Sequence, residues 1–566
     1  MYIESIPNRK SPPAILLRES VRQGRKVVKR TLANVSHWPK PKIEALRSVL
    51  RDEPLAPPEQ LFEIERSRPH GHVEMVLGMI RQLGLDQMLF SKRCRQRDLI
   101  LAMLAQRILF PASKLANTRL WHTTTLAEQL CVQDANENEL YAALDWLLKR
   151  QPAVEKKLAA RHLREGALVL YDISSSYYYG QTCPLARHGH NRDGDNGLPI
   201  IVYGVLADEA GRPLAVDVYP GNTGDPSTVP DQVEKVRQSF GLERIVLAGD
   251  RGMLTQTQIT TLQQYPGLGW ISALRSTAIR ELVAAGTVQR SLFDDCNLAE
   301  ISSTDFPGER LVACYNPLLA EERKRTRNEL LTATEKELEK IVRAVQRRTK
   351  TPLSASEIGV KVGRSINRFK MGKHFETRIA DGVFSYSRKR EGIAQEEQLD
   401  GLYVLRTSEP QTRLSAADVV RGYKSLAQVE RVFRCVKGLD IMVQPIFLRT
   451  EEHVRAHIFL CVLACYVEWH LREALAPLLF ADDQVASERK TRDPVAPAKP
   501  SATAVLKRAR HLTPEGFEVQ DFRTLLQVMA TRCRSTCRFK SHPDSVFVQV
   551  TKPDALQAHI LKLLKL

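Results

Sequence analysis

The chain has 566 residues, of which 83 are lysine or arginine and 65 are acidic, giving a formal net charge of +18. A hydrophobic fraction of 43% is enough for several buried cores. The best apolar run, residues 457–467, is too short for a membrane span and is expected to be a buried helix. The ten cysteines lack a repeating pattern, which predicts a reduced, cytoplasmic protein without membrane partners.

Positive charge is concentrated at the two ends of the chain. Residues 1–50 hold eleven lysines and arginines against three acids, and residues 501–566 hold eleven against five. Such basic ends favour a polyanionic partner, most simply DNA or RNA, over a merely soluble basic surface. Cys533 and Cys537 are not spaced as a standard zinc-ligand pair, so ordinary thiols are expected there.

The N-terminal part is predicted to contain a hairpin, a linker and a helical domain. Residues 14–36 consist of two β-rich runs on either side of a Gln-Gly turn, which indicates a hairpin within a basic region, 1–51. The proline-rich segment 52–60 is typical of a linker. Helical periodicity then dominates residues 60–165, which we interpret as a helical N-terminal domain.

An α/β pattern follows. Residues 167–180 form an apolar strand that ends in hydroxyls, residues 198–222 form two strands joined by a tight turn, and residues 243–252 form a short buried strand after a helix. Three antiparallel strands, a helix and a further strand are the order in which a ribonuclease H-like fold begins.

Residues 253–398 interrupt this pattern with a highly charged helix, 320–350, and an apolar strand at 399–407 restores it. An insertion within one α/β domain explains both observations. The predicted domains are therefore a ribonuclease H-like core in 166–252 and 399–478, an insertion domain in 253–398, and a linker with a basic C-terminal region in 479–566. Within the last, residues 487–502 are expected to be a flexible linker.

Residues 421–440 are predicted to form one amphipathic helix. Tyr423, Glu430 and Lys437 are seven residues apart, close to two helical turns, and so share one stripe. An adjoining apolar stripe would face a core and consists of Val429, Val432, Phe433 and Val436. The helix would thus hold an acid at the edge of a buried face.

Two further acids follow apolar strands. Asp172 comes after Val-Leu-Tyr and Asp250 after Val-Leu-Ala-Gly, and each is interpreted as ending its strand, where ligands gather in α/β folds. Each acid alone is as well explained as a turn former, and Glu430 alone as a solvated helix residue. Together they predict a cluster that a cation must neutralise, and carboxylate oxygens suit two Mg²⁺ ions, with Mn²⁺ as a substitute.

With this acid set the chain resembles the DDE transposases of bacterial insertion sequences, in particular the IS-four superfamily and its Tyr–Arg–Glu–Lys signature. Tyr423, Glu430 and Lys437 keep the spacing of the signature, whereas Leu426 stands at its arginine. The loop 221–228 and the segment 445–460 also resemble that family. The resemblance extends over roughly residues 165–475.

The resemblance implies roles for individual residues. Asp172, Asp250 and Glu430 would be catalytic and would ligate the two metal ions, and Tyr423, Lys437 and Arg434 would contact DNA phosphates. The protein would bind terminal inverted repeats through its basic N-terminal region, cleave double-stranded DNA at the element ends and join them to a target. A homodimer on DNA and a bacterial, nucleoid-associated location are implied in the same way.

Three alternatives remain open at the level of the sequence. One is a related metal-dependent nuclease that cuts without joining. Another is a non-catalytic DNA-binding protein or an inactive remnant, against which the intact acid set argues. The third, a structural RNA-binding protein, is suggested by charge alone.

Overall fold

The computed structural model describes residues 1–9, 11–52, 61–190, 197–540 and 542–566, so most of the expected linker 52–60 lies outside the described residues. The chain divides into two compact units. The first comprises Met1–Gly71 and Ala530–Pro553, and the second comprises His72–Met529 and Asp554–Leu566.

The described residues of the first unit form two three-stranded antiparallel sheets and the helix α1. The predicted hairpin is present, and a further strand extends it: β1 (Tyr2–Ile6), β2 (Ala14–Gln23) and β3 (Lys26–Asn34), followed by α1 (Lys40–Leu50). In the other sheet β15 (Cys533–Phe539) lies between β4 (Phe62–Pro69) and β16 (His542–Val550). This pairing differs from the all-helical character expected of residues 60–165, because β4 finds its partner near the opposite end of the chain.

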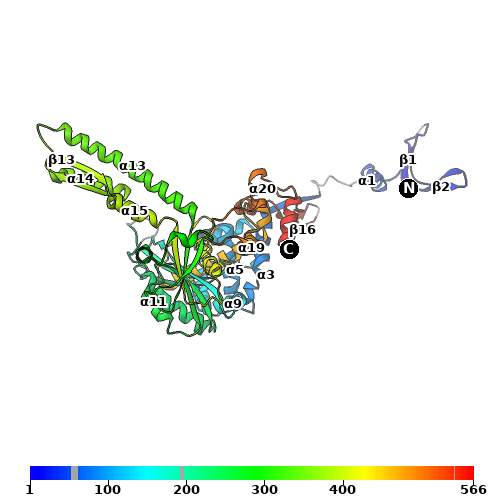
Figure 1. The fold of residues 1–566 in the computed structure, drawn as a ribbon. Coiled ribbons are helices and arrows are strands. Elements are labelled where there is room, and N and C mark those ends of the chain that lie inside the picture. The colour runs from blue at the N-terminus through cyan, green and yellow to red at the C-terminus, as the bar shows by residue number, and fades with distance from the viewer. Residues whose placement is uncertain (10, 53–60, 191–196, 541) are drawn as a thin grey trace. The chain divides into compact units, whose positions relative to one another are not determined.

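A mixed eight-stranded sheet is the centre of the second unit (Figure 1). Its strands lie in the order β10 (Leu298–Ile301), β11 (Arg310–Tyr315), β14 (Leu402–Thr407), β9 (Leu268–Ala273), β8 (Ile245–Ala248), β5 (Ala167–Tyr177), β6 (Ile200–Asp208) and β7 (Pro213–Pro220). The β5–β8 and β8–β9 pairs are parallel, and the other pairs are antiparallel. This confirms the predicted succession of three antiparallel strands, a helix and a further strand.

Two groups of helices accompany this sheet, one before its first three strands in the sequence and one after them. The helices that precede β5 in the sequence are α3 (Gly71–Gln82), α4 (Leu85–Leu89), α5 (Arg95–Leu109), α6 (Lys114–Leu120), α7 (Leu126–Leu130), α8 (Glu137–Leu148) and α9 (Gln151–His162). Those that follow β7 are α10 (Val229–Glu234), α11 (Gln256–Leu262), α12 (Ser276–Ala284), α16 (Ala416–Lys424), α17 (Leu426–Lys437) and α18 (Glu451–Ala474). All four residues of β8 are buried, as expected of a central parallel strand.

The helix α18 contains the apolar run singled out in the sequence. It is the one described helix that is by itself long and apolar enough to cross a membrane, and 83% of its apolar window is buried inside the protein. The segments Arg95–Leu109 and Lys114–Thr123 pass the same test only as a pair bent by 87°. A helix that is apolar on all sides is what a large core requires, and α18 packs against β7, α5 and α8.

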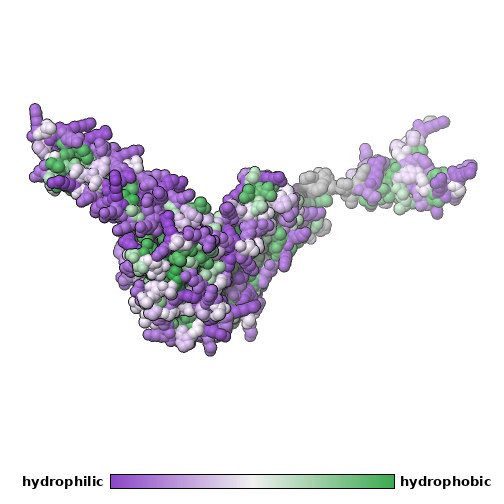
Figure 2. Space-filling model, viewed as in Figure 1, coloured by the Kyte–Doolittle hydropathy of each residue, from purple (hydrophilic) through white to green (hydrophobic). Residues whose placement is uncertain are grey.

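The predicted insertion 253–398 is not a single separate body. Its strands β9, β10 and β11 belong to the central sheet. Residues 317–398 have a hydrophobic core of their own and contain α13 (Pro317–Arg347), α14 (Ala355–Phe369), β12 (Phe375–Ala380), β13 (Val383–Arg388) and α15 (Arg390–Gln398). Figure 2 shows a mainly hydrophilic surface over α13, in keeping with the charged sequence of this helix.

The C-terminal region also differs from expectation. The segment 487–502, expected to be a flexible linker, includes most of α19 (Val485–Thr491), and Val495 is fully buried in the main core. Three further helices follow, which are α20 (Ala502–Arg510), α21 (Phe522–Ala530) and α22 (Ala555–Leu563).

Candidate active site

Asp172 and Asp250 lie at the same level of two neighbouring parallel strands. The last residues paired between β5 and β8 are Leu170 and Ala248, and each aspartate follows its strand's paired residue by two positions. Side chains two positions apart in a strand share a face of the sheet. Both aspartates are therefore at the carboxyl ends of the paired segments, and the charges of both act on one side chain, that of Tyr423.

The expectation that Asp172 ends its strand is wrong. β5 continues to Tyr177, and Asp172 pairs with Val205 of β6. Only the pairing with β8 stops before Asp172, at Leu170. The aspartate is thus paired with β6 on one side, and on the other side it lies beyond the end of β8. The pairing with β6 holds it more firmly than a loop would.

The surroundings of the two aspartates differ. Asp172 is half-buried, and its Oδ1 accepts a hydrogen bond of 2.8 Å from the N–H of Ile173. Asp250 is exposed, and its main-chain oxygen accepts hydrogen bonds of 3.0 Å from Met253 and Leu254, which fix the turn after β8. The Asp250 carboxylate has no hydrogen bond or ion pair with any described residue.

The predicted helix 421–440 is two helices, α16 and α17, which meet at the fully buried Ser425. The Ser425 hydroxyl donates a 3.0 Å hydrogen bond to the carbonyl of Arg421. The guanidinium of Arg489, from α19, also binds both that carbonyl and the Ser425 hydroxyl. These additional bonds to one helical carbonyl account for the break. Tyr423 is consequently on α16, whereas Glu430 and Lys437 are on α17.

The break nevertheless leaves Tyr423 close to both aspartates. Burial, then the negative charge of Asp250 and, more weakly, that of Asp172 raise the pKa of the Tyr423 phenol to about 12, while Arg251 lowers it. A close approach of α16 to the sheet brings the phenol there. A Cβ at Gly422 would lie 2.9 Å from Cδ1 of Ile271 and 3.3 Å from a methyl group of Leu168.

The face of α17 that was predicted to be apolar is buried, which confirms that stripe: Val429, Val432, Phe433 and Val436. This face packs on β5. On the other face Glu430 and Arg434 are exposed and one turn apart. Neither has a hydrogen bond or ion pair from its side chain to a described residue.

Lys437 is half-buried and reaches the strand that carries Asp172. Its Nζ donates a hydrogen bond of 3.3 Å to Oγ of Ser174, which is two residues after Asp172 and so on the same face of β5. The contact sets an ammonium group beside the strand of the first aspartate.

Leu426 occupies the signature position of the arginine and is half-buried against the main core. The guanidinium of Arg489 brings a positive charge to this part of the chain, through its bonds to Ser425 and Arg421. Nothing in the sequence pattern pointed to Arg489, because it is contributed by a segment 64 residues beyond Ser425.

The three acids offer the hard oxygen donors that Mg²⁺ prefers, and the carboxylates of Asp250 and Glu430 are uncommitted within the described chain. Asp250 and Asp172 both raise the pKa of Tyr423, so two of the acids act on the same side chain. The site therefore fits a divalent cation. The ligand atoms of the three acids do not all lie within 4.8 Å of one another; in the described chain the one such group is Cys435, Asp440 and Glu468.

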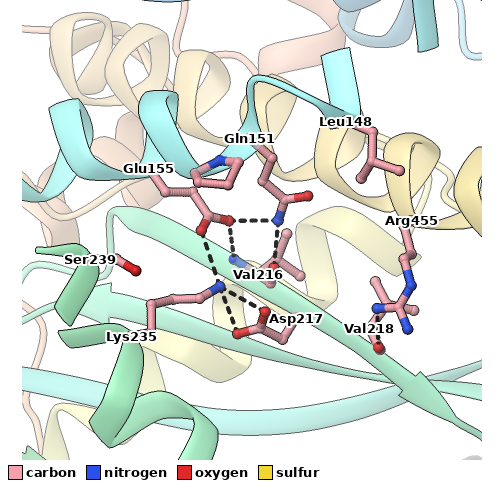
Figure 3. A pocket seen from close by; sticks show the side chains of 10 residues that line it. Leu148, Gln151, Glu155, Val216, Asp217, Val218, Lys235, Ser239 and Arg455 are labelled. Atoms are coloured by element: carbon pink, nitrogen blue, oxygen red, sulfur yellow. Dashed lines mark hydrogen bonds and ion pairs between the residues drawn. The ribbon is translucent and has the colours of Figure 1, made fainter. Parts of the chain in front are cut away.

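A separate polar cavity of about 290 Å³ lies at the edge strand β7 (Figure 3). There Glu155 and Gln151, from α9, bind the N–H and the C=O of Val216, at 3.0 and 2.8 Å. Lys235 bridges Glu155 and Asp217, at 3.0 and 2.7 Å. These side chains satisfy the outer edge of the sheet, so the cavity is accounted for by the architecture.

Comparisons with known proteins were made for the whole chain. No curated protein matches it. Among solved structures, a cryo-EM structure of the piggyBac transposase synaptic complex with hairpin DNA aligns with 81% of this chain and 76% of its own, at 9% sequence identity and a TM-score of 0.34. Residues 190–467 match the family described as the transposase DDE domain, and this match supports a DDE transposase.

Proposed function

We propose that the protein is a metal-dependent transposase with a ribonuclease H-like catalytic core. It would bind the terminal inverted repeats of a mobile element, cleave the DNA at both ends and join the ends to target DNA. The proposal assigns the end-binding role to the basic region 1–51 and catalysis to Asp172, Asp250 and Glu430. The location that goes with this activity is the bacterial cytoplasm, at the nucleoid when DNA is bound.

The observation that carries the proposal is that Asp172 and Asp250 each lie two positions beyond the last paired residues of the parallel strands β5 and β8, and that both act on Tyr423. The carboxyl ends of parallel strands are where α/β folds bind ligands. A structural role for both aspartates would be expected to show partners, yet Asp250 is exposed and has none in the described chain.

Asp172, Asp250 and Glu430 would hold two Mg²⁺ ions. When bound, the ions would activate a water or a 3′-hydroxyl and stabilise the leaving oxygen of a phosphodiester. The protein's own part is to fix the acids in place: Asp172 within β5, Asp250 in the hydrogen-bonded turn after β8, and Glu430 on a helix anchored by its apolar face. ATP is not needed, because strand transfer exchanges one phosphodiester for another.

The cationic groups would orient the DNA. Lys437 can offer its ammonium as a point charge to a phosphate beside Asp172, and Arg434 can offer a planar fork of donors from the exposed face of α17. Tyr423 keeps its proton at neutral pH, since its pKa is raised to about 12, and so acts as a hydrogen-bond donor.

The experiment that tests the proposal is an end-cleavage and joining assay. The protein is incubated with DNA carrying the inverted repeats that flank its gene, in Mg²⁺ or in EDTA, and cleaved and joined products are separated. We expect metal-dependent nicking at the element ends and joining of their 3′-hydroxyls. Nicking without joining would favour a nuclease, and binding without nicking would favour a non-catalytic protein.

Matched variants make the assay specific to the site. Glu430→Gln keeps the size of an exposed helical side chain and removes its charge, and Glu281→Gln does the same on α12. We expect the first variant to be inactive and the second to be active. Full activity of Glu430→Gln would remove the glutamate from the reaction.

A homodimer that bridges two DNA ends is part of the same proposal. The mass of the complex with end DNA, measured by light scattering, tests it: two protomers with two ends are expected. One protomer with one end, in a complex that still cleaves, would contradict the dimer and leave the chemistry intact.

A further inference from the structure

Sulfur and oxygen ligands converge where the end of α17 meets α18. Cys435 is in α17, Asp440 follows this helix and Glu468 is in α18, and one potential ligand atom from each lies within 4.8 Å of the others. No other group of three in the described chain meets this condition. The cluster contains none of the three acids proposed for catalysis.

A second thiol lies beside the group. Cys465 precedes Glu468 by three residues, about one turn of α18, and is buried. Cys465 and burial together raise the pKa of the Cys435 thiol well above its ordinary value, so the two thiols are neighbours. Two thiols and two carboxylates are therefore presented from two packed helices and the turn between them.

The group contains a buried oxygen that lacks a partner. Glu468 is fully buried, and its Oε1 accepts a 2.7 Å hydrogen bond from Nε of Arg472. Its Oε2 is also buried and has no hydrogen bond within the described chain. An unpaired carboxylate oxygen in a protein interior is costly, because it loses its water without a replacement. A ligand at this position would remove the cost.

Two arginines limit which ligand fits. Arg472 also binds Asp440, at 2.9 Å, and Arg523 approaches the same carboxylate at 3.8 Å. Their two positive charges balance the two carboxylates. The charge of an entering cation must therefore be balanced by further negative groups. The two thiols become these groups when they lose their protons.

We propose that Cys435, Cys465, Asp440 and Glu468 form a structural Zn²⁺ site. Zinc is bound tetrahedrally by thiolates at about 2.3 Å and by carboxylates at about 2.0–2.2 Å, which separates neighbouring ligand atoms by roughly 3.3–3.8 Å. This separation fits within the 4.8 Å that joins Cys435, Asp440 and Glu468, and Cys465 would approach the ion as the fourth ligand. Mg²⁺ is disfavoured, because it prefers oxygen ligands only. Binding releases the two thiol protons and leaves a neutral group of four anions, two guanidiniums and one Zn²⁺.

The site would tie α17 to α18. Lys437 is two residues after Cys435 and three before Asp440. The ion would therefore fix the end of α17, where Lys437 lies. The effect would be on the rigidity of α17, not on the chemistry of bond cleavage. The inference does not depend on the proposed transposase activity.

Cobalt substitution of the whole protein tests the site. The purified chain is stripped with a chelator and titrated with Co²⁺, and its absorption spectrum is recorded. We expect one equivalent of Co²⁺ with a thiolate-to-metal charge-transfer band, displaced by one equivalent of Zn²⁺. Co²⁺ bound by the catalytic carboxylates gives no such band. A spectrum without it overturns the proposal.

Variants locate the band. Cys435→Ser changes a half-buried residue, Cys465→Ser a buried one, and Cys314→Ser is the control, a buried thiol in the central sheet. Since losing even an outer contact of a metal ligand lowers affinity 10–100-fold, we expect either cluster variant to weaken Zn²⁺ binding by at least about 100-fold. Circular dichroism checks the fold of each variant. A charge-transfer band that persists in Cys435→Ser overturns the assignment.

Discussion

The ammonium of Lys437 and the hydroxyl of Ser174 are joined by a hydrogen bond of 3.3 Å between α17 and β5. This contact links the last turn of one helix to the strand that carries Asp172. It holds the lysine beside the acid, where a phosphate of bound DNA would be attracted to the ammonium, and it makes the contribution of Lys437 separable from that of the acids.

We therefore expect Lys437→Ala to bind end DNA more weakly while remaining folded. A lysine that contacts one phosphate contributes about one unit to the slope of log affinity against log salt. Fluorescence anisotropy over a series of salt concentrations measures this slope. Lys156→Ala, which removes an exposed lysine from α9, should leave it unchanged. Equal slopes for wild type and Lys437→Ala would exclude a phosphate contact.

The level shared by Asp172 and Asp250 leads to a second expectation. Asp250→Asn keeps the size of an exposed side chain and should not affect stability. Loss of a metal-bound carboxylate is expected to remove several kcal/mol of transition-state stabilisation, which corresponds to a rate of end cleavage about 1000-fold lower. Rates from a single-turnover assay test this. A loss below tenfold, with normal DNA binding, would place Asp250 outside the reacting centre.

Much of the site could be predicted because its signals are local. The apolar face of α17 follows from the spacing of Val429, Val432 and Val436, and the strands before Asp172 and Asp250 follow from their short apolar runs. The order of the predicted strands along the chain was also sufficient to predict that the first three strands of the central sheet pair in antiparallel fashion. Each of these features depends on side chains within a few residues of one another.

The features that sequence reasoning missed depend on distant contacts. The break at Ser425 requires Arg489, which lies 64 residues further on, and β4 becomes a strand only by pairing with β15. The end of the β5–β8 pairing at Leu170 is decided by the short β8, whereas β6 pairs beyond Asp172. A pattern within one segment carries no information about such partners, and tertiary contacts override it.

Gly422 offers a test of how α16 positions Tyr423. A methyl group at 422 would meet Ile271 at 2.9 Å, so Gly422→Ala should push α16 from the sheet and destabilise the protein by about 1–3 kcal/mol. Gly359, in α14, has open space around its Cβ position, and Gly359→Ala should stabilise by roughly 0.5–1 kcal/mol. Urea denaturation measures both changes. The same sign for both would contradict the close approach.

Lys235 compensates two acids at the edge of the sheet. Burial raises the pKa of Glu155, whereas Lys235 lowers it; burial alone would lower the pKa of Lys235, but Glu155 and Asp217 outweigh it and raise that pKa. Lys235→Met would leave a buried acid unpaired beside Val216, and breaking such a pair costs about 3–5 kcal/mol. Glu155→Gln with Lys235→Met should recover part of this loss. If the double variant is no more stable than Lys235→Met, the two residues are not coupled.

Lys114 lies in the core, where its Nζ is 3.1 Å from Nδ1 of His457. Burial, and then Arg107, lowers the pKa of Lys114 from an ordinary value of 10.5 to about 7, while Cys461 opposes this shift. Between pH 7 and 10.5 the unfolded chain therefore holds more protons at this lysine than the folded chain. The contribution of Lys114 to the free energy of unfolding must rise with pH in that window and be constant below it.

Lys114→Met removes this contribution, together with the hydrogen bond to His457. We expect the free energy of unfolding of the wild type, relative to that of Lys114→Met, to increase as the pH rises from 7 toward 10, by up to about 1.4 kcal/mol per pH unit. Urea denaturation at a series of pH values measures the difference, and Lys156→Met serves as the exposed control, with a difference that does not change with pH. If the difference for Lys114→Met is also flat, the lysine is not held neutral by the core, and water must reach its ammonium group.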